Sequence, residues 1–327
     1  MGFMRSTSVL AVALGAASVL ALAGCSGTAT PQASDDGRVS VVASTNVWGD
    51  IASAVGGDLV DVTSIIASVA QDPHEYEASA RDQLSVSRAA LVIENGGGYD
   101  AFVDDLIAGS GTDAPVITAA ERSDAWPDDD HTDDEHSDDE HSDDDHAGHD
   151  HAEGFNEHVW YDPHTVAHVA EEIAHELSEL DAANAATYEA NYEAFAAGIQ
   201  GLEASLDELA AQYSGEQIFV TEPVPLYLTE AAGLVNATPS AFSEAVEEGQ
   251  DVPAATLLEA TRILSGGGIR TLIANAQTGG PETDAVIATA KDAGIPVLEF
   301  TELVPDGETY LTWMQANITA LAGTLAR

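Results

Sequence analysis

The chain has 327 residues, of which 57 are acidic, 9 are basic and 45% are hydrophobic. This length is sufficient for two lobes of ordinary domain size, each with a buried core. The formal net charge of −48 repels nucleic-acid phosphates and anionic lipid headgroups, which excludes both as partners. A chain of this charge attracts cations, although its general acidity alone assigns no function.

Residues 1–24 have the features of a secretory signal peptide. Arg5 precedes a short apolar run over residues 9–22, and small residues lead to Cys25. The sequence Leu-Ala-Gly-Cys at 22–25 resembles a bacterial lipobox, and Cys25 is the only cysteine, so it has no disulfide partner within the chain. We predict an exported chain with a lipid on Cys25 that anchors it to the outer face of the cell membrane. A cleaved signal followed by an incidental cysteine is the alternative.

The tether and the folded part follow in order along the chain. Residues 25–37 are small and polar, as in a flexible tether. From residue 38 to 180, short β-branched runs alternate with Ala-rich helical segments, and the same alternation returns over 214–327, which predicts parallel sheets. Between them, residues 181–213 carry apolar side chains at spacings of three and four, as in one long amphipathic helix. The predicted fold class is α/β, with two parallel-sheet lobes joined by a single long rigid helix.

A low-complexity insert of aspartate, glutamate and histidine occupies residues 128–153. It has too few apolar residues to pack, so we expect a disordered loop. Imidazole binds zinc, copper and nickel well, and the surrounding carboxylates raise the local cation concentration. An acidic spacer with incidental histidines is the alternative. We predict metal capture by the six histidines His131, His136, His141, His146, His149 and His151.

Candidate ligands for a structured site follow predicted strands in both lobes. His74 lies between a predicted strand and a predicted helix, and Glu222 follows the strand that ends at Val220. Ligands collect at the carboxyl ends of parallel strands, which favours these positions. His158 follows the insert, and Asn275 and Gln277 offer amide oxygens after a further strand. Imidazole nitrogens with a carboxylate suit zinc, whereas extra oxygen ligands shift the preference towards manganese.

Several ordered motifs resemble the zinc and manganese solute-binding lipoproteins of bacterial ABC importers. These motifs are residues 44–46 (STN), 48–51 (WGDI), 72–77 (DPHEYE), 158–163 (HVWYDP), 221–223 (TEP), 275–278 (NAQT) and 293–296 (AGIP). The resemblance covers residues 38–327. It implies a metal held between two α/β lobes, with His74 and His158 as the first two ligands and Glu222 at a third position that is His or Glu in the family.

The fourth ligand position departs from the family, where many members have a carboxylate. We predict Gln277 there, with Asn275 or water as alternatives. Family members of the zinc type carry an acidic His-rich loop ahead of the second histidine, as this chain does. The predicted cargo is therefore Zn²⁺, with Mn²⁺ as the alternative, and the predicted partner is the ABC importer permease, which a monomeric receptor would reach from its lipid anchor.

Other chemistries are less well supported. His164, His168 and His175 share one predicted helix, and we expect most helix-surface histidines of this kind to face solvent rather than to form a second metal site. A zinc hydrolase needs an open coordination position and a general base, and no substrate pocket is predicted, so we expect no enzyme. An extracellular metal buffer or adhesin that acts through the His-rich loop is the remaining alternative.

Overall fold

The computed structural model describes residues 37–71, 73, 76–127 and 154–327. The predicted signal peptide, Cys25, the tether up to residue 36, the His-rich insert and His74 lie outside the described residues. Within the described residues, no helix is both long and apolar enough to cross a membrane.

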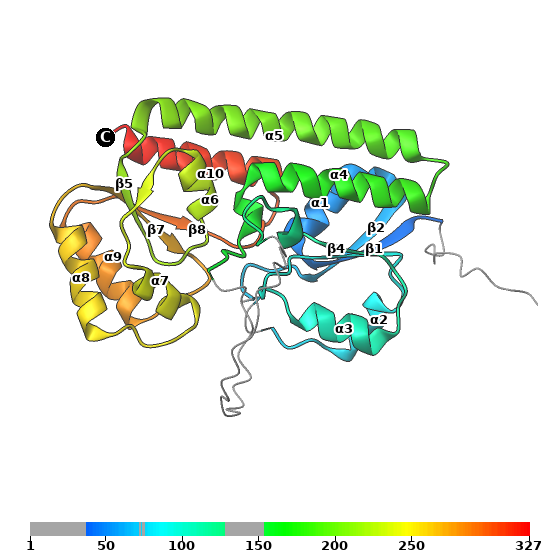
Figure 1. The fold of residues 1–327 in the computed structure, drawn as a ribbon, viewed down its shortest axis with the longest axis horizontal. Helices are drawn as coiled ribbons and strands as arrows, with labels where there is room; N and C mark the ends of the chain where they lie inside the picture. Colours follow the sequence, from blue (N-terminus) through cyan, green and yellow to red (C-terminus); the bar gives the residue numbers. More distant parts are fainter. Residues whose placement is uncertain (1–36, 72, 74–75, 128–153) are drawn as a thin grey trace, which may run out of the picture. The chain divides into compact units, whose positions relative to one another are not determined.

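Two parallel four-stranded sheets confirm the predicted α/β class (Figure 1). The first has the order β2-β1-β3-β4 and the second the order β6-β5-β7-β8. The strands are β1 Val39–Thr45, β2 Val60–Ile66, β3 Leu91–Glu94, β4 Val116–Thr118, β5 Gln217–Val220, β6 Val235–Asn236, β7 Ile269–Asn275 and β8 Val297–Phe300.

Helices connect the strands as parallel pairing requires. The α-helices are α1 Asn46–Gly56, α2 Ala80–Val86, α3 Phe102–Ser110, α4 Pro163–Leu180, α5 Ala185–Tyr213, α6 Leu226–Ala231, α7 Ser240–Glu247, α8 Ala254–Ser265, α9 Pro281–Asp292 and α10 Tyr310–Leu325. Three 3₁₀ turns are also formed by described residues: η1 Gly57–Leu59, η2 Ala120–Arg122 and η3 Val159–Tyr161.

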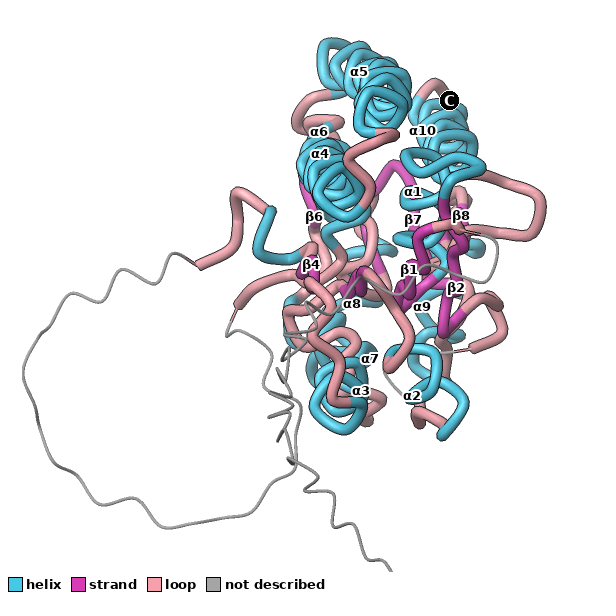
Figure 2. The backbone as a smooth tube through the Cα atoms, turned by 90° about the vertical axis from the view of Figure 1, so that its right-hand side faces the viewer, coloured by secondary structure: helices cyan, strands magenta, loops and turns pink. Residues whose placement is uncertain are grey.

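Each sheet is covered by helices on both faces (Figures 1 and 2). Successive side chains of a strand point to opposite faces. In β1, Val41 belongs to the core cluster that includes α1 and α4, whereas its neighbour Val42 belongs to the cluster that includes α2 and α3. Burial on both faces explains why the strands are short, nearly continuous apolar runs in the sequence.

The predicted helix over 181–213 begins at Ala185 in the structure and ends at Tyr213, as predicted. Its buried side chains recur at spacings of three, four and seven, and α5 packs against α1, α4 and α10. These buried residues are Tyr188, Phe195, Ile199, Leu202, Leu206 and Leu209. Its role as a rigid linker between the lobes stays a prediction.

Direct hydrogen bonds join the two halves of the chain. The Asn46 side chain donates to Val304 O at 2.8 Å and accepts from Val304 N at 3.1 Å. A carboxylate oxygen of Asp50 accepts from Tyr310 N at 2.7 Å. These bonds hold the first two turns of α1 against Val304, which precedes α10, and against the first residue of α10, and they therefore restrict how far the two sheets can move apart there.

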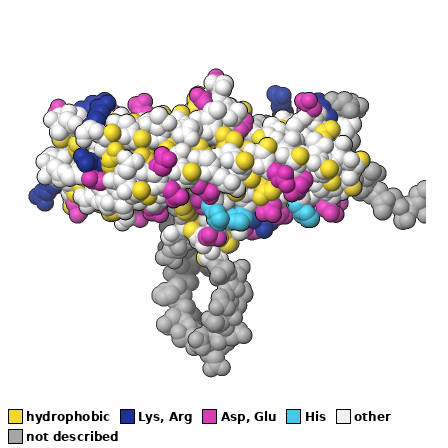
Figure 3. Space-filling model, turned by 90° about the horizontal axis from the view of Figure 1, so that it is seen from above, with side chains coloured by type: hydrophobic (Ala, Val, Ile, Leu, Met, Phe, Trp, Pro, Cys, Tyr) yellow, Lys and Arg dark blue, Asp and Glu magenta, His cyan; other side chains and the backbone are white. Residues whose placement is uncertain are grey.

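Acidic side chains are common over the face of the molecule in Figure 3, in keeping with the net charge. One acidic group is buried instead. Glu94 ends β3 with 8% of its surface exposed, and its Oε1 accepts from Thr118 Oγ1 at 2.8 Å. Burial, with the nearby Asp100 carboxylate, raises the pKa of Glu94 to about 7.

We predict that Glu94→Gln stabilises the metal-free protein at pH 8. A raised carboxyl pKa means that the folded state binds the proton more tightly than the unfolded state. Stability is therefore lost as pH rises from about 4.5 to about 7. Glutamine keeps the acceptor for Thr118 without the charge, so the gain in unfolding free energy is about 3 kcal/mol at pH 8 and shrinks towards zero near pH 4.

Urea unfolding in a chelator at both pH values measures this difference. Glu299→Gln, at an exposed position in β8, is the matched control and is expected to change stability little at either pH. An equal gain for Glu94→Gln at pH 4 and pH 8 would contradict the explanation.

Candidate metal centre

The strand order reverses direction once in each sheet. In the first sheet, β2 pairs on one side of β1 and β3 pairs on its other side. In the second sheet, β6 and β7 flank β5 in the same way. The strand order therefore reverses between β1 and β3, and between β5 and β7. Ligands of open parallel sheets bind beyond the carboxyl ends of the strands at such a reversal. Glu222 follows β5 and Asn275 ends β7, so both stand at the reversal of the second sheet.

Two buried glutamates meet on the side chain of Asn275. Its Nδ2 donates to Glu222 Oε2 at 2.9 Å and to Glu302 Oε1 at 2.6 Å. Glu222 is 3% exposed and Glu302 is 1% exposed. Thr278 Oγ1 also donates to Glu222 Oε1, and Tyr99 OH donates to Glu302 Oε2 at 2.9 Å. Neutral donors thus hold two carboxylates together that would otherwise repel each other.

His158 is fully enclosed ahead of η3. Asn156 Oδ1 lies 3.2 Å from the backbone N and 2.8 Å from the ring Nδ1 of His158. The rings of Tyr99 and Trp160 contact the imidazole edge-on, with centroids 5.9 Å and 5.1 Å away. If Nδ1 donates to Asn156, the ring lone pair is on Nε2, the nitrogen that we expect to bind a cation.

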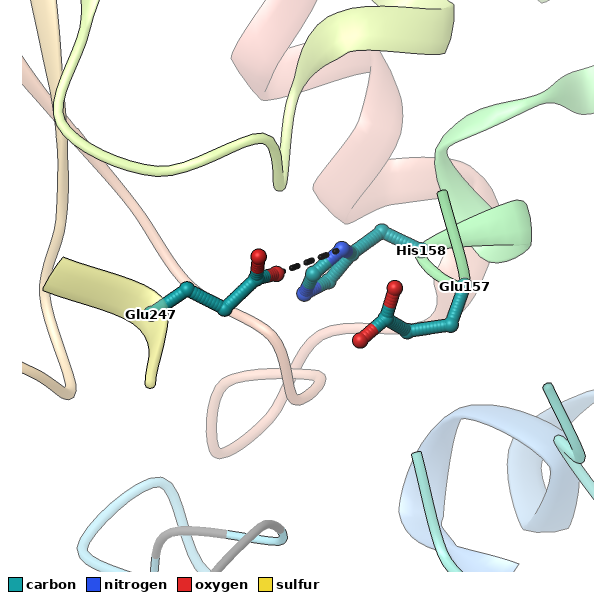
Figure 4. Close-up of side chains that lie close together, drawn as sticks. All are labelled: Glu157, His158 and Glu247. Atoms are coloured by element: carbon teal, nitrogen blue, oxygen red, sulfur yellow. Dashed lines mark ion pairs between the residues drawn. The ribbon is translucent and has the colours of Figure 1, made fainter. Parts of the chain in front are cut away.

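Two further glutamates stand beside His158 (Figure 4). Glu247 is the last residue of α7, and its Oε1 is 3.7 Å from His158 Nδ1. One ligand atom from each of Glu157, His158 and Glu247 lies within 4.8 Å of the others. Glu157 is 3% exposed, and its carbonyl accepts from Asn95 Nδ2 at 2.9 Å.

Glu157, Glu222, Glu247 and Glu302 form one electrostatic cluster, because the charges of the other three act on Glu247. Burial, together with the charges of Glu157, Glu222 and Glu302, raises the pKa of Glu247 to about 9. A carboxyl group surrounded by like charges takes up a proton, or a cation, in preference to remaining ionised. One imidazole with several carboxylates is a donor set that suits zinc, manganese or ferrous iron.

The sequence-predicted residues fall into three groups. His158 and Glu222 are buried, and each lies against carboxylates of the same cluster. Gln277 is close by, but its Nε2 donates to Gln71 O at 3.0 Å and its Oε1 accepts from Glu302 N at 2.6 Å. The amide thus holds the backbone of Glu302 and the segment three residues ahead of His74. A ligand role for Gln277 stays a prediction, and His74 lies outside the described residues.

Sequence analysis missed three acidic residues of the cluster. Glu302 lies two residues beyond β8, so the strand-end reasoning applied to Glu222 could have found it. Glu157 directly precedes His158, but only His158 was predicted as a ligand. Nothing in the sequence singles out Glu247, because it belongs to a run of surface-like acidic residues at the end of a short helix.

Comparisons with known proteins agree on one family. The profile described as "ZnuA: Zinc-uptake complex component A periplasmic" matches residues 41–324. The manganese-binding lipoprotein MntA of Halalkalibacterium halodurans is 27% identical over 216 residues, which are 65% of this chain and 64% of that protein, so the match spans slightly less than two thirds of this relative. The iron ABC transporter substrate-binding lipoprotein MtsA of Streptococcus pyogenes serotype M1 is 26% identical over 327 residues, which cover 95% of this chain and 96% of that protein.

Solved structures share the fold. The periplasmic zinc binding protein TroA from Treponema pallidum superposes with a TM-score of 0.70 at 16% identity, covering 89% of this chain and all of that one. At this identity the likeness concerns the fold alone.

We predict that Asn275→Asp destabilises the metal-free protein at pH 8 by about 3 kcal/mol, because it removes two donors and adds a charge between two buried carboxylates. Asn236→Asp is the matched control, since Asn236 Oδ1 only accepts from Thr238 N, which aspartate can also do. Chemical unfolding of both variants measures the difference. Wild-type stability in Asn275→Asp would show that Glu222 and Glu302 do not depend on this amide.

Proposed function

Since the chain belongs to the ZnuA family of metal-binding substrate-binding proteins of ABC importers, we propose that it captures zinc outside the cell and delivers it to the membrane permease. The observation that carries the proposal is the buried imidazole of His158 facing a cluster of carboxylates. Burial of so many acidic groups is unfavourable unless a cation or protons neutralise them.

The proposed ligands are His158 through Nε2, Glu222, Glu302 and His74. Glu302 supports the fourth position better than Gln277, because its carboxylate is buried and shares the Asn275 donor with Glu222. Gln277 then acts as a positioning residue, since it accepts from the backbone N–H of Glu302 and binds the Gln71 carbonyl ahead of His74.

Manganese is the second candidate cargo. Oxygen donors outnumber nitrogen donors among the described residues of the cluster, and oxygen-rich sites favour manganese over zinc. The related lipoproteins are named for manganese and iron, which supports the same possibility. The His-rich insert favours zinc, because imidazole is a good zinc ligand.

The remaining parts of the proposal concern the surroundings of the receptor. A lipid on Cys25 anchors a monomer to the outer face of the membrane, and the His-rich insert collects cations for the buried site. The receptor catalyses no reaction. A metal buffer or adhesin that acts through the insert is the competing function, and it places tight binding in residues 128–153 instead of at His158.

Calorimetric titration of metal-free residues 26–327 with zinc and with manganese tests the proposal. We expect one tight site with zinc preferred, retained when residues 128–153 are deleted. His158→Ala is expected to weaken that site at least ~100-fold, because it removes a ligand. His175→Ala, an exposed histidine of α4, is the control and leaves tight binding unchanged.

Each alternative result has a clear meaning. Tighter binding of manganese would change the cargo and keep the receptor. Loss of tight binding on deletion of the insert, with no effect of His158→Ala, would favour the buffer or adhesin.

We further predict that Glu247→Gln weakens binding of the preferred cation roughly tenfold, because it removes the carboxylate that would ionise beside His158 when a cation displaces its proton. The same change is expected to raise the stability of the metal-free protein, since it relieves carboxylate crowding. Glu248→Gln, at the exposed neighbouring position, is the control for both measurements. Unchanged affinity in Glu247→Gln would place this carboxylate outside the binding site.

A further inference from the structure

Two exposed histidines stand one turn apart on α4, away from the buried cluster. His164 and His168 have their Nε2 atoms 3.2 Å apart, with ring centroids 4.7 Å apart and ring planes at 87°. Two imidazole nitrogens bound to one tetrahedral zinc, each at 2.0–2.1 Å, are separated by about 3.3 Å. We propose that His164 and His168 form a second, surface-exposed chelate for a divalent transition-metal cation such as zinc.

Acidic groups surround this histidine pair. Asp124 Oδ2 is 3.8 Å from His164 Nε2, and Glu203 Oε1, from α5, is 3.8 Å from His164 Nδ1. The first carboxylate can approach the same cation as His164, directly or through a water, and the second can orient the ring by accepting from Nδ1. Imidazole with nearby carboxylate suits zinc, copper and nickel.

Space for a hydrated cation is available beside the pair. An open cavity of about 480 Å³ adjoins His168 and is lined by polar side chains. These are Arg122, Asp124, His168, Glu171, Glu172 and His175. Water can therefore fill the remaining coordination positions, so the chelate is weaker than the buried site.

Two effects oppose cation binding by His164 and His168, and both are small. The positive end of the α4 dipole lies near His164 and opposes a cation by roughly 0.3–1 kcal/mol. The N-cap carboxylate of Asp162, which accepts from the backbone N–H groups of His164 and Thr165, offsets this charge. A single N–H···N hydrogen bond between the two rings would also explain their contact, but an exposed bond of that kind adds little stability, and a cation can replace it.

Residue-resolved chemical modification tests the chelate in residues 26–327. Diethylpyrocarbonate carbethoxylates accessible imidazoles, and mass spectrometry measures the rate at each histidine with and without zinc. At a zinc concentration about ten times the dissociation constant, occupancy slows modification of His164 and His168 roughly tenfold. His175, exposed on the same helix, lines the cavity but is not part of the proposed chelate, so its rate is expected to fall less than those of His164 and His168.

Single substitutions decide whether the two histidines act as a pair. His168→Ala is expected to abolish zinc protection of His164, and His164→Gln that of His168. Protection is expected to persist in His158→Ala, so failure of the buried site leaves this test intact. Equal modification rates with and without zinc, or protection of His164 that survives His168→Ala, would overturn the proposal.

Discussion

Carboxylate crowding around one buried imidazole is the constraint on which the rest of the centre depends. Glu157 and Glu247 lie beside His158, and the charges of Glu157, Glu222 and Glu302 add to burial in raising the pKa of Glu247. Two like charges 4–5 Å apart cost roughly 3–4 kcal/mol at an effective dielectric constant of 20. The fold tolerates the cluster in the absence of metal because protons and neutral donors reduce this repulsion, and a divalent cation would remove most of it.

Neutral amide and hydroxyl groups supply this local compensation. Asn275 donates to two carboxylates at once, and the hydroxyl of Tyr99 completes the hydrogen bonding of Glu302. Asn156 fixes the ring of His158 through the contact between its Oδ1 and the ring Nδ1. None of these side chains carries a charge, so Asn275 and Tyr99 orient the carboxylates without neutralising them. The negative potential therefore remains for a cation, which a lysine or arginine at the same place would have cancelled.

The fold and part of the centre could be predicted because they depend on local patterns. Apolar runs and helical spacings identify both parallel sheets and α5, and the strand-end argument selects Glu222. The same argument applies to Glu302, which lies two residues beyond β8, although the amides of residues 275–278 were predicted for that position. Glu247 could not be predicted, since its position beside His158 depends on how the two halves of the chain meet. In a chain with 57 acidic residues, the few that are buried have no distinguishing local sequence.

Bonds between the two halves indicate which part of the centre can move. Asn46 binds both backbone groups of Val304, which precedes α10, and Asp50 binds the first residue of α10, so α1 is joined to this segment at two points. Large opening of the two sheets would break these bonds together. Glu247, by contrast, ends an eight-residue helix, and Gly249 lies just beyond it with a positive φ of 63°. Separation of the two halves would therefore break several hydrogen bonds at once, whereas a local displacement of α7 would leave these bonds intact.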